Sequence, residues 1–181
     1  MASRYEIRLA GEGGQGLLVA GRVLAEAAAL YDGKNAVQTQ SYGAQQRGGP
    51  SRSEVIISDG EIDHPKVLVA NLLLALTQDA FDRYCNAMAK DGIIVVDSGT
   101  VERSIDHPSY RIPLAEICRE ATGSDAMISI ISLGMVAEVS RQVSQEAIIQ
   151  ALMAHIPKGT EKANQKALEV GFQIADKFHV A

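Results

Sequence analysis

The sequence predicts an α/β protein with one Rossmann-like domain, residues 1–181, built from a mostly parallel sheet with helices on both faces. Three observations support this fold class. Short apolar runs alternate along the chain with longer helical patterns. Several of these runs are apolar throughout, as in strands buried between two helix layers. A glycine-rich turn also follows the first run and precedes a helix rich in small residues, which is typical of a strand-to-helix corner.

The first strand is expected over residues 5–9, where apolar and polar residues alternate, and the glycine-rich turn follows it. Gly11, Gly13 and Gly16 have the G-x-G-x-x-G spacing, in which backbone N–H groups can approach an anion at a helix N-terminus. We therefore expect a phosphate or carboxylate to bind at this turn, with backbone donors from Gly13, Gly14, Gln15 and Gly16. The alternative is that these glycines only close a tight packing corner.

A helix is expected from about Gln15 to Leu30, ended by Asp32 and Gly33, and a second strand over residues 35–41. A ribose-binding site would place an acid near the end of that second strand. Its end carries only amides and hydroxyls, and Asp32 lies in the turn before it. An ordinary NAD site is therefore disfavoured.

Residues 42–53 have almost no apolar content although they join two predicted strands, so we expect a functional surface loop. Arg47 offers a planar fork for a phosphate or carboxylate, next to Gly48 and Gly49, whose backbone no side chain obstructs. We expect Arg47 to clamp the anion bound at the glycine-rich turn, with Gly48 and Gly49 allowing close approach. The alternative is a solvated loop with a turn at Gly48 and Gly49.

The remaining elements continue the alternation. Strands are expected over residues 54–58, within 67–76, over 92–97 and around 110–112. Helices are expected over 77–89, 113–121, 127–139, 144–155 and 160–178, with Thr77 and Ser144 as N-caps and Gly92 ending the first of them. The helix over 127–139 is apolar nearly all round, so it must be buried in this domain or against another subunit. Asp97 follows a strand at the edge where open α/β sheets bind ligands, but it also fits a turn former.

Several classes of function are disfavoured by composition. The formal net charge of −5 and the lack of a basic cluster make nucleic acid an unexpected partner. The longest apolar run, residues 67–76, is too short to span a bilayer, and the N-terminus does not read as a signal peptide, so we expect a cytoplasmic protein. Neither Cys85 nor Cys118 belongs to a C-x-x-C pair, and we expect both to be buried thiols. The four histidines show no metal-ligand spacing, and no catalytic motif occurs, so no metal or catalytic residue is assigned.

A combination of motifs resembles the gamma subunit of the 2-oxoacid:ferredoxin oxidoreductases over nearly the whole chain. These motifs are the turn over residues 11–16, Tyr42-Gly43 followed by Arg47-Gly48-Gly49, and the segments 54–59 and 62–65. Within that family the loop looks most like 2-oxoglutarate enzymes, although the pyruvate, branched-chain oxoacid and indolepyruvate enzymes have closely related chains. One residue departs from the family pattern: Ser129 stands where an Asn is expected ahead of Leu133 and Gly134.

The resemblance implies a subunit of an enzyme that oxidatively decarboxylates a 2-oxoacid, forms an acyl-CoA and reduces ferredoxin. It implies coenzyme A (CoA) at or near this chain, and thiamine diphosphate, Mg²⁺ and iron–sulfur clusters on partner subunits. The implied partners are alpha, beta and ferredoxin-like delta subunits, with ferredoxin reached through the complex; the isolated chain is expected to be inactive and able to form a homodimer. Two alternatives remain open: a purely structural assembly subunit, and an independent nucleotide-binding oxidoreductase.

Overall fold

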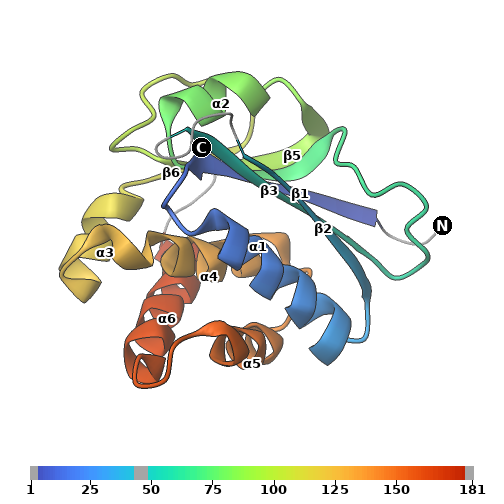
Figure 1. The fold of residues 1–181 in the computed structure, drawn as a ribbon. Helices are drawn as coiled ribbons and strands as arrows, with labels where there is room; N and C mark the ends of the chain where they lie inside the picture. The colour runs from blue at the N-terminus through green and yellow to red at the C-terminus, as the bar shows by residue number, and fades with distance from the viewer. Residues whose placement is uncertain (1–3, 43–48, 178–181) are drawn as a thin grey trace.

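A six-stranded sheet runs through the domain, with the strand order β2-β3-β1-β4-β5-β6 (Figure 1). The computed structural model describes residues 4–42 and 49–177. The strands are β1 (Arg4–Glu12), β2 (Asn35–Tyr42), β3 (Pro50–Ser58), β4 (Ala70–Ala75), β5 (Met88–Asp97) and β6 (Ser109–Ile112). Strands β1, β4, β5 and β6 pair in parallel, whereas β3 is antiparallel to both of its neighbours, β1 and β2. The sheet is thus mostly parallel, as predicted.

Helices cover the two faces of the sheet unequally. Helix α2 (Gln78–Tyr84) lies on one face (Figure 1). The other face carries α1 (Leu17–Glu26), which continues as the π-helix η1 (Ala27–Tyr31), together with α3 (Leu114–Thr122), the short 3₁₀ helix η2 (Asp125–Met127), α4 (Ile128–Ser140), α5 (Gln145–His155) and α6 (Glu161–Lys177). The predicted arrangement of helices on both faces is confirmed.

The core follows the alternation of side chains along the strands. Leu72 and Leu74 of β4 belong to the larger apolar cluster under α1, α4 and α6, while Leu73 and Ala75 belong to the smaller one under α2. All four are buried. Because both faces of this strand are covered by apolar neighbours, its sequence is a continuous apolar run.

Helix α4 is buried within this domain, packed against α1 and α6. Gly134 of α4 and Gly171 of α6 let the two backbones approach: a Cβ on Gly171 would lie 2.1 Å from the carbonyl oxygen of Ile131. A Cβ on Gly134 would lie 2.5 Å from the carbonyl oxygen of Leu168. Of the two alternatives for this apolar helix, burial in the domain is therefore the one observed.

Several boundaries differ from the sequence-based expectation. Strand β1 continues to Glu12 instead of ending at residue 9, so Gly11 is a strand residue that pairs with Ser51. Strand β3 begins at Pro50, so residues 50–53 extend a strand in place of the predicted loop. Helix α2 ends at Tyr84, not near residue 89, and β5 already begins at Met88, which pairs with Ala70. Gly92 does not end a helix; it lies where the register of β5 shifts, and a Cβ there would be 3.0 Å from the Ala70 carbonyl oxygen.

Local signals placed most of the helix ends correctly. The side chain of Thr77 caps α2 by accepting from the Ala80 N–H, and Ser144 caps α5 by accepting from the Ala147 N–H. Gly33 has a positive φ of 66° after η1, as expected for the residue that ends this helix. In the described part of the chain, no single helix is long and apolar enough to cross a membrane; α3 and the segment Asp125–Ser140 meet that criterion only jointly, with a bend of 115° between them.

Candidate functional site

The glycine-rich turn lies at the carboxyl edge of the parallel strands, between the end of β1 and the start of α1. Two of its glycines have positive φ, with 100° at Gly14 and 79° at Gly16. Gly16 is the N-cap residue of α1 and contributes no capping side chain. The first N–H groups of an α-helix have no partner within the helix, so α1 presents unpaired donors beside this turn.

Gly11 and Gly16 also meet a packing requirement. A Cβ on Gly16 would lie 2.5 Å from the Ser129 hydroxyl oxygen, and a Cβ on Gly11 would lie 2.2 Å from the Gln15 amide oxygen. By contrast, a Cβ on Gly14 would meet nothing within 4 Å. The packing-corner interpretation therefore accounts for Gly11 and Gly16, whereas Gly14 is required only by its backbone conformation.

The hydrogen bonds of the turn narrow the set of backbone donors. The N–H of Gly13 donates to the Gly49 carbonyl oxygen at 2.8 Å, and the N–H of Gln15 donates to the Glu12 carbonyl oxygen at 3.3 Å. The side-chain oxygen of Gln15 accepts from the Glu12 N–H at 2.7 Å. Within residues 4–42 and 49–177, the N–H groups of Gly14 and Gly16 have no acceptor. These two groups and the first turn of α1 are thus the donors that remain for an anion.

The two predicted halves of the site meet at the bond between Gly13 and Gly49. Gly49 is buried and directly precedes β3. Arg47 and Gly48 lie outside the described residues. The structure thus brings one end of the predicted anion loop into contact with the glycine-rich turn, 36 residues away in the sequence. The role of Arg47 remains a prediction.

Ser129, the residue that departs from the family pattern, lies directly beside the turn. It is in the first turn of α4, is 5% exposed, and approaches Gly16 as described above. The position at which this chain differs from the expected Asn is therefore part of the same site. An Asn side chain would place an amide NH₂ donor and a carbonyl acceptor at this position. Ser129 instead offers one hydroxyl group on a shorter side chain.

Arginine side chains that were not predicted lie on the α2 side of the turn. A cavity of about 120 Å³ opens there, lined by Gly11, Ser41, Pro50, Ser51, Arg52, Ala80, Arg83 and Tyr84. The guanidinium of Arg52 lies 5.5 Å from the centre of the Tyr84 ring, and that of Arg8 lies 4.8 Å from it. Arg8 is buried and paired with Glu54 at 2.7 Å. Arg52 and Glu54 are charged residues two positions apart, a period-2 pattern that is typical of a strand. The predicted loop ended at residue 53 and so divided this pattern between two elements.

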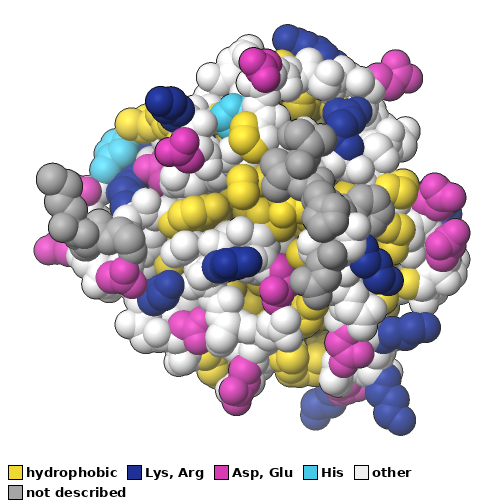
Figure 2. Space-filling view, turned by 180° about the vertical axis from the view of Figure 1, so that it is seen from behind, with side chains coloured by type: hydrophobic (Ala, Val, Ile, Leu, Met, Phe, Trp, Pro, Cys, Tyr) yellow, Lys and Arg dark blue, Asp and Glu magenta, His cyan; other side chains and the backbone are white. Residues whose placement is uncertain are grey.

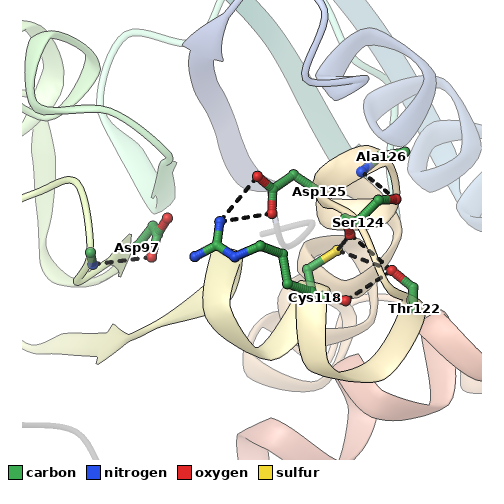
Figure 3. Close-up of polar contacts among 8 residues, drawn as sticks. Asp97, Cys118, Thr122, Ser124, Asp125 and Ala126 are labelled. Carbon is green, nitrogen blue, oxygen red and sulfur yellow. Dashed lines mark hydrogen bonds and ion pairs between the residues drawn. The ribbon is translucent and has the colours of Figure 1, made fainter.

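Asp97 acts as a turn former. Its side-chain Oδ1 accepts from the Gly99 N–H at 3.2 Å (Figure 3). Its carbonyl oxygen accepts from the Val101 N–H at 2.9 Å. The carboxylate is buried at the end of β5. Asp32, the other acid considered for a nucleotide, is at the turn before β2 and accepts from the Ser144 N–H and hydroxyl at 2.6 and 2.8 Å. Its bonds anchor the start of α5, which confirms its assignment to the turn.

Both cysteines are free and buried, as predicted. The Cys118 thiol contacts the Ser124 carbonyl oxygen at 3.1 Å, and burial raises the pKa of this thiol (Figure 3). Among the residues that the structure describes, no three His, Cys, Asp or Glu side chains gather as a metal site would require. On the face seen in Figure 2, Lys and Arg side chains are interspersed with Asp and Glu side chains.

Fold and site together define a class of protein: an α/β domain in which a glycine-rich turn joins a strand to a helix at the carboxyl edge of a mostly parallel sheet. The profile of the pyruvate ferredoxin/flavodoxin oxidoreductase family matches residues 6–174. The chain belongs to this family, and the predicted relationship to the gamma subunits of the 2-oxoacid:ferredoxin oxidoreductases is confirmed. It is accordingly one subunit of a multi-subunit oxidoreductase.

Individual relatives agree with this assignment. The chain is 43% identical over 176 residues to the 2-oxoglutarate synthase subunit KorC of Methanocaldococcus jannaschii, covering 95% of this chain and 94% of the relative. The keto/oxoacid ferredoxin oxidoreductase gamma subunit of Geobacter sulfurreducens superposes with a TM-score of 0.89 at 39% identity, over 99% of each chain. The 2-oxoglutarate:ferredoxin oxidoreductase of Magnetococcus marinus, described with 2-oxoglutarate, coenzyme A and succinyl-CoA bound, shares the fold with a TM-score of 0.88 at 21% identity, over 98% of this chain and 32% of that chain.

Proposed function

We propose that this chain is the gamma subunit of a cytoplasmic 2-oxoglutarate:ferredoxin oxidoreductase and that its glycine-rich turn binds an anionic group of CoA. The choice of 2-oxoglutarate is supported by the KorC relative, which is named as a 2-oxoglutarate synthase subunit. The choice of CoA is supported by the Magnetococcus marinus enzyme, which is described with CoA bound and contains a domain of this fold.

The observation that carries the CoA proposal is the contact between Gly13 and Gly49, because it joins the turn to the end of the Arg47 loop. The N–H groups of Gly14, Gly16 and the first turn of α1 offer backbone donors at this place. Arg52 and Arg83 line the cavity that Gly11 shares; Arg83 is paired with Asp79 at 2.9 Å, and Arg52 lies 3.7 Å from Glu54. A phosphate or pyrophosphate is the CoA group that this combination suits.

The partners proposed for this subunit are alpha and beta chains and a ferredoxin-like delta chain. Thiamine diphosphate, Mg²⁺ and the iron–sulfur clusters are assigned to these partner subunits. The two cysteines of this chain are too few for a cluster that requires about four thiolates. With the oxoacid and electron chemistry located on other chains, selectivity for 2-oxoglutarate is also expected to lie there.

The first test is reconstitution of activity. The partner subunits are assayed for 2-oxoglutarate- and CoA-dependent reduction of a viologen dye, first alone and then with this chain added. Activity should appear, or rise strongly, only on addition, and a pyruvate control should give the weaker rate. An unchanged rate, with no association between the chains, contradicts the proposed function; a preference for pyruvate contradicts only the choice of oxoacid.

The second test addresses the CoA contact. In the assembled enzyme, Arg47→Ala should weaken the apparent affinity for CoA by about ten- to a hundredfold, the loss of one charge-assisted contact of roughly 1.5–3 kcal/mol. Arg103→Ala is the matched control, because this arginine pairs with the exposed Asp82 at 2.7 Å. Its CoA affinity should stay unchanged. Equal affinities for the Arg47→Ala and control enzymes would remove the clamp role.

A purely structural role for the turn is favoured by one observation, the close approach of Gly16 to Ser129. Under that alternative the turn shapes a surface for a partner subunit. Gly14→Ala would then weaken association with the partner subunits and leave the CoA affinity of the remaining assembled enzyme intact. Under the proposed function, the same variant loses CoA affinity in an enzyme that still assembles.

A further inference from the structure

The cavity on the α2 side of the sheet adjoins a cluster of charged side chains. Residues that oppose one another on paired strands point to the same face of a sheet. Arg52 of β3 opposes Ala10 of β1, and Glu54, two residues further along β3, opposes Arg8. Helix α2 covers this face (Figure 1) and sets the centre of the Tyr84 ring 4.8 Å from the Arg8 guanidinium and 5.5 Å from that of Arg52. We call these four residues, Arg8, Arg52, Glu54 and Tyr84, the Tyr84 cluster.

One carboxylate serves two guanidiniums in the Tyr84 cluster. Glu54 lies 2.7 Å from Nε of Arg8 and 3.7 Å from Nε of Arg52. The side chains of Arg8 and Glu54 are 5% and 8% exposed, so this pair is shielded from water. Because arginine stays protonated in proteins, the cluster carries a surplus of one positive charge. A shielded charge without a counter-ion is costly, and an anion that reaches it is therefore favoured.

Hydrogen-bond donors of the cluster also remain unused. Arg8 donates from Nη2 to the Val67 carbonyl oxygen at 3.0 Å, but its Nη1 is buried and has no acceptor in the described part of the chain. Arg52 makes one long hydrogen bond, from Nη1 to the Tyr84 hydroxyl at 3.4 Å. Its side chain is 33% exposed and lines the cavity. Arg52 is thus the member of the cluster that a ligand can reach, while Arg8 adds its charge from within.

The other charged residues near the cavity do not form ion pairs that remove this surplus. Arg83 also lines the cavity, but it is paired with Asp79 at 2.9 Å, so these two residues cancel each other. Glu12 is on the same face of β1 as Ala10, at the end of the strand. It is exposed, and among the residues that the structure describes it forms no ion pair.

We propose that this cavity binds one oxyanion of the size of a phosphate group, with the Arg52 guanidinium as its main contact and Tyr84 holding that guanidinium in place. The planar fork of an arginine matches two oxygens of such a group. The cavity measures about 120 Å³. A single buried water needs roughly 10–15 Å³, so there is room for a phosphate group but not for a whole nucleotide.

This site differs from the anion site proposed at the glycine-rich turn. The cavity includes Gly11 but neither Gly14 nor Gly16, which carry the unpaired N–H groups of the turn. The inference therefore goes beyond the function proposed above and does not depend on it.

The first experiment measures the thermal stability of the full chain in inorganic phosphate. A ligand of the folded state raises the melting temperature as it saturates its site. Phosphate should do so with half-saturation at about 0.1–10 mM, the range that two charge-assisted hydrogen bonds give, whereas sodium chloride of equal ionic strength should not. Arg52→Gln should raise the half-saturating concentration about tenfold or more. Arg103→Gln is the matched control, because this arginine pairs with the exposed Asp82, and it should respond as the wild type does.

The same variant separates a ligand-binding role of Arg52 from a structural one. Arg52→Gln leaves Arg8 and Glu54 as a balanced pair, so in phosphate-free chloride buffer its melting temperature should equal or exceed that of the wild type. Loss of a residue that only packed on Tyr84 would lower the melting temperature in both buffers. Arg52→Lys keeps the charge without the planar fork and should bind phosphate with intermediate affinity.

Nuclear magnetic resonance then locates the bound phosphate. The amide resonances of Arg52, Ala80 and Tyr84 should shift as phosphate is added, and those of Gly14 and Gly16 should not. Gly14→Ala should keep the full phosphate response. Shifts confined to Gly14 and Gly16 would place the anion at the glycine-rich turn and overturn the proposal.

Two sources offer the same chemistry, a free oxyanion and the 3′-phosphate of CoA, and competition distinguishes them. If CoA displaces phosphate from the wild-type chain and dephospho-CoA does not, the cavity takes the 3′-phosphate. If neither displaces it, the cavity takes a free oxyanion. Both results support the cavity as a site, and the second leaves the CoA proposal for the turn to its own test.

Two further results would overturn the proposal. The first is a melting temperature that phosphate and chloride change equally. The second is a phosphate response that Arg52→Gln retains in full. In either case the surplus charge is met from within the chain, and Glu12 is the carboxylate that the strand register places on this face.

Discussion

Glycines serve different purposes in two regions of this domain, the turn before α1 and the crossing of α4 with α6. At the crossing, Gly134 and Gly171 allow two backbones to touch, and a Cβ at either would collide with a carbonyl oxygen. At the turn, Gly14 has no neighbour within 4 Å of such a Cβ, and its requirement is a φ of +100°. Glycine is needed in one region for space and in the other for backbone conformation.

Gly16 combines both requirements, with a φ of +79° and the Ser129 hydroxyl in the way of a Cβ. The contacts also differ in how far they can relax. A serine hydroxyl can rotate away, whereas a helical carbonyl oxygen is fixed by its own hydrogen bonds. The comparison therefore predicts an order of cost for alanine substitutions: first the helix crossing, then Gly16, then Gly14.

The largest effect is expected for Gly171→Ala. The new Cβ would lie 2.1 Å from the Ile131 carbonyl oxygen, so α4 and α6 must separate, at a cost of about 3 kcal/mol or more in the free energy of unfolding. Urea denaturation measures this loss. Gln173→Ala, at an exposed position of the same helix, should change stability by less than about 0.5 kcal/mol. If both variants were equally stable, the close crossing would not be a constraint.

An intermediate effect is expected for Gly16→Ala, about 2 kcal/mol, because the positive φ is strained and the Cβ meets Ser129. Adding Ser129→Ala removes the hydroxyl but not the strain. The double variant should thus recover part of the stability lost by the single one, and a double-mutant cycle measures that coupling. Full recovery would show that the contact alone matters, and no recovery would show that only the backbone conformation does.

Gly14→Ala should cost the least stability of the three, about 1 kcal/mol, since only the backbone conformation opposes it. For CoA affinity the order should be reversed, with the largest loss in Gly14→Ala. A methyl group beside the unpaired N–H at Gly14 hinders an anion, so CoA affinity in the assembled enzyme should fall, whereas Gly171→Ala should leave it unchanged in the folded fraction. A loss of CoA affinity that simply followed stability across the variants would contradict a ligand role for the turn.

The sequence was sufficient to predict the fold class and most elements, because the signals used were local. The apolar runs, the Thr77 and Ser144 caps and the Gly33 terminator each act within a few residues of the structure that they specify. The failures involve distant partners. Strand β3 extends back to Pro50 because its residues pair with β1 and β2, and Met88 is extended because it pairs with Ala70.

The candidate site was predicted to a similar degree. Spacing identified the turn, but not that the Gly13 N–H would be used by Gly49 or that Ser129 would adjoin Gly16. Arg52 and Arg83 were missed because they belong to different elements, β3 and α2, which only the fold brings to one cavity. The order of strands was likewise beyond local patterns: β3 separates β1 from β2, so the first two strands are not neighbours.

The smallest predicted effect concerns the opposite end of α1, far from the turn. Glu26 contacts His155 of α5 and pairs with Arg22 at 2.9 Å. Burial alone would raise the pKa of this carboxyl, but the hydrogen bonds from His155 and Arg22 outweigh it, so the pKa is lowered from its ordinary value of 4.5.

A carboxyl with a lowered pKa stabilises the fold above its unfolded-state pKa, and this contribution is lost as the pH falls through the folded-state value. The stability of the wild-type chain should therefore fall more steeply below about pH 4.5 than that of Glu26→Gln, by less than about 1 kcal/mol for a partly exposed pair. Urea titrations at several pH values measure this difference. Glu120→Gln, at an exposed position of α3, is the control and should follow the wild-type curve. CoA affinity of the assembled enzyme at neutral pH should be equal for all three proteins, because this end of α1 anchors the helix and does not face the ligand; a CoA defect in Glu26→Gln would show that the two ends of α1 are coupled.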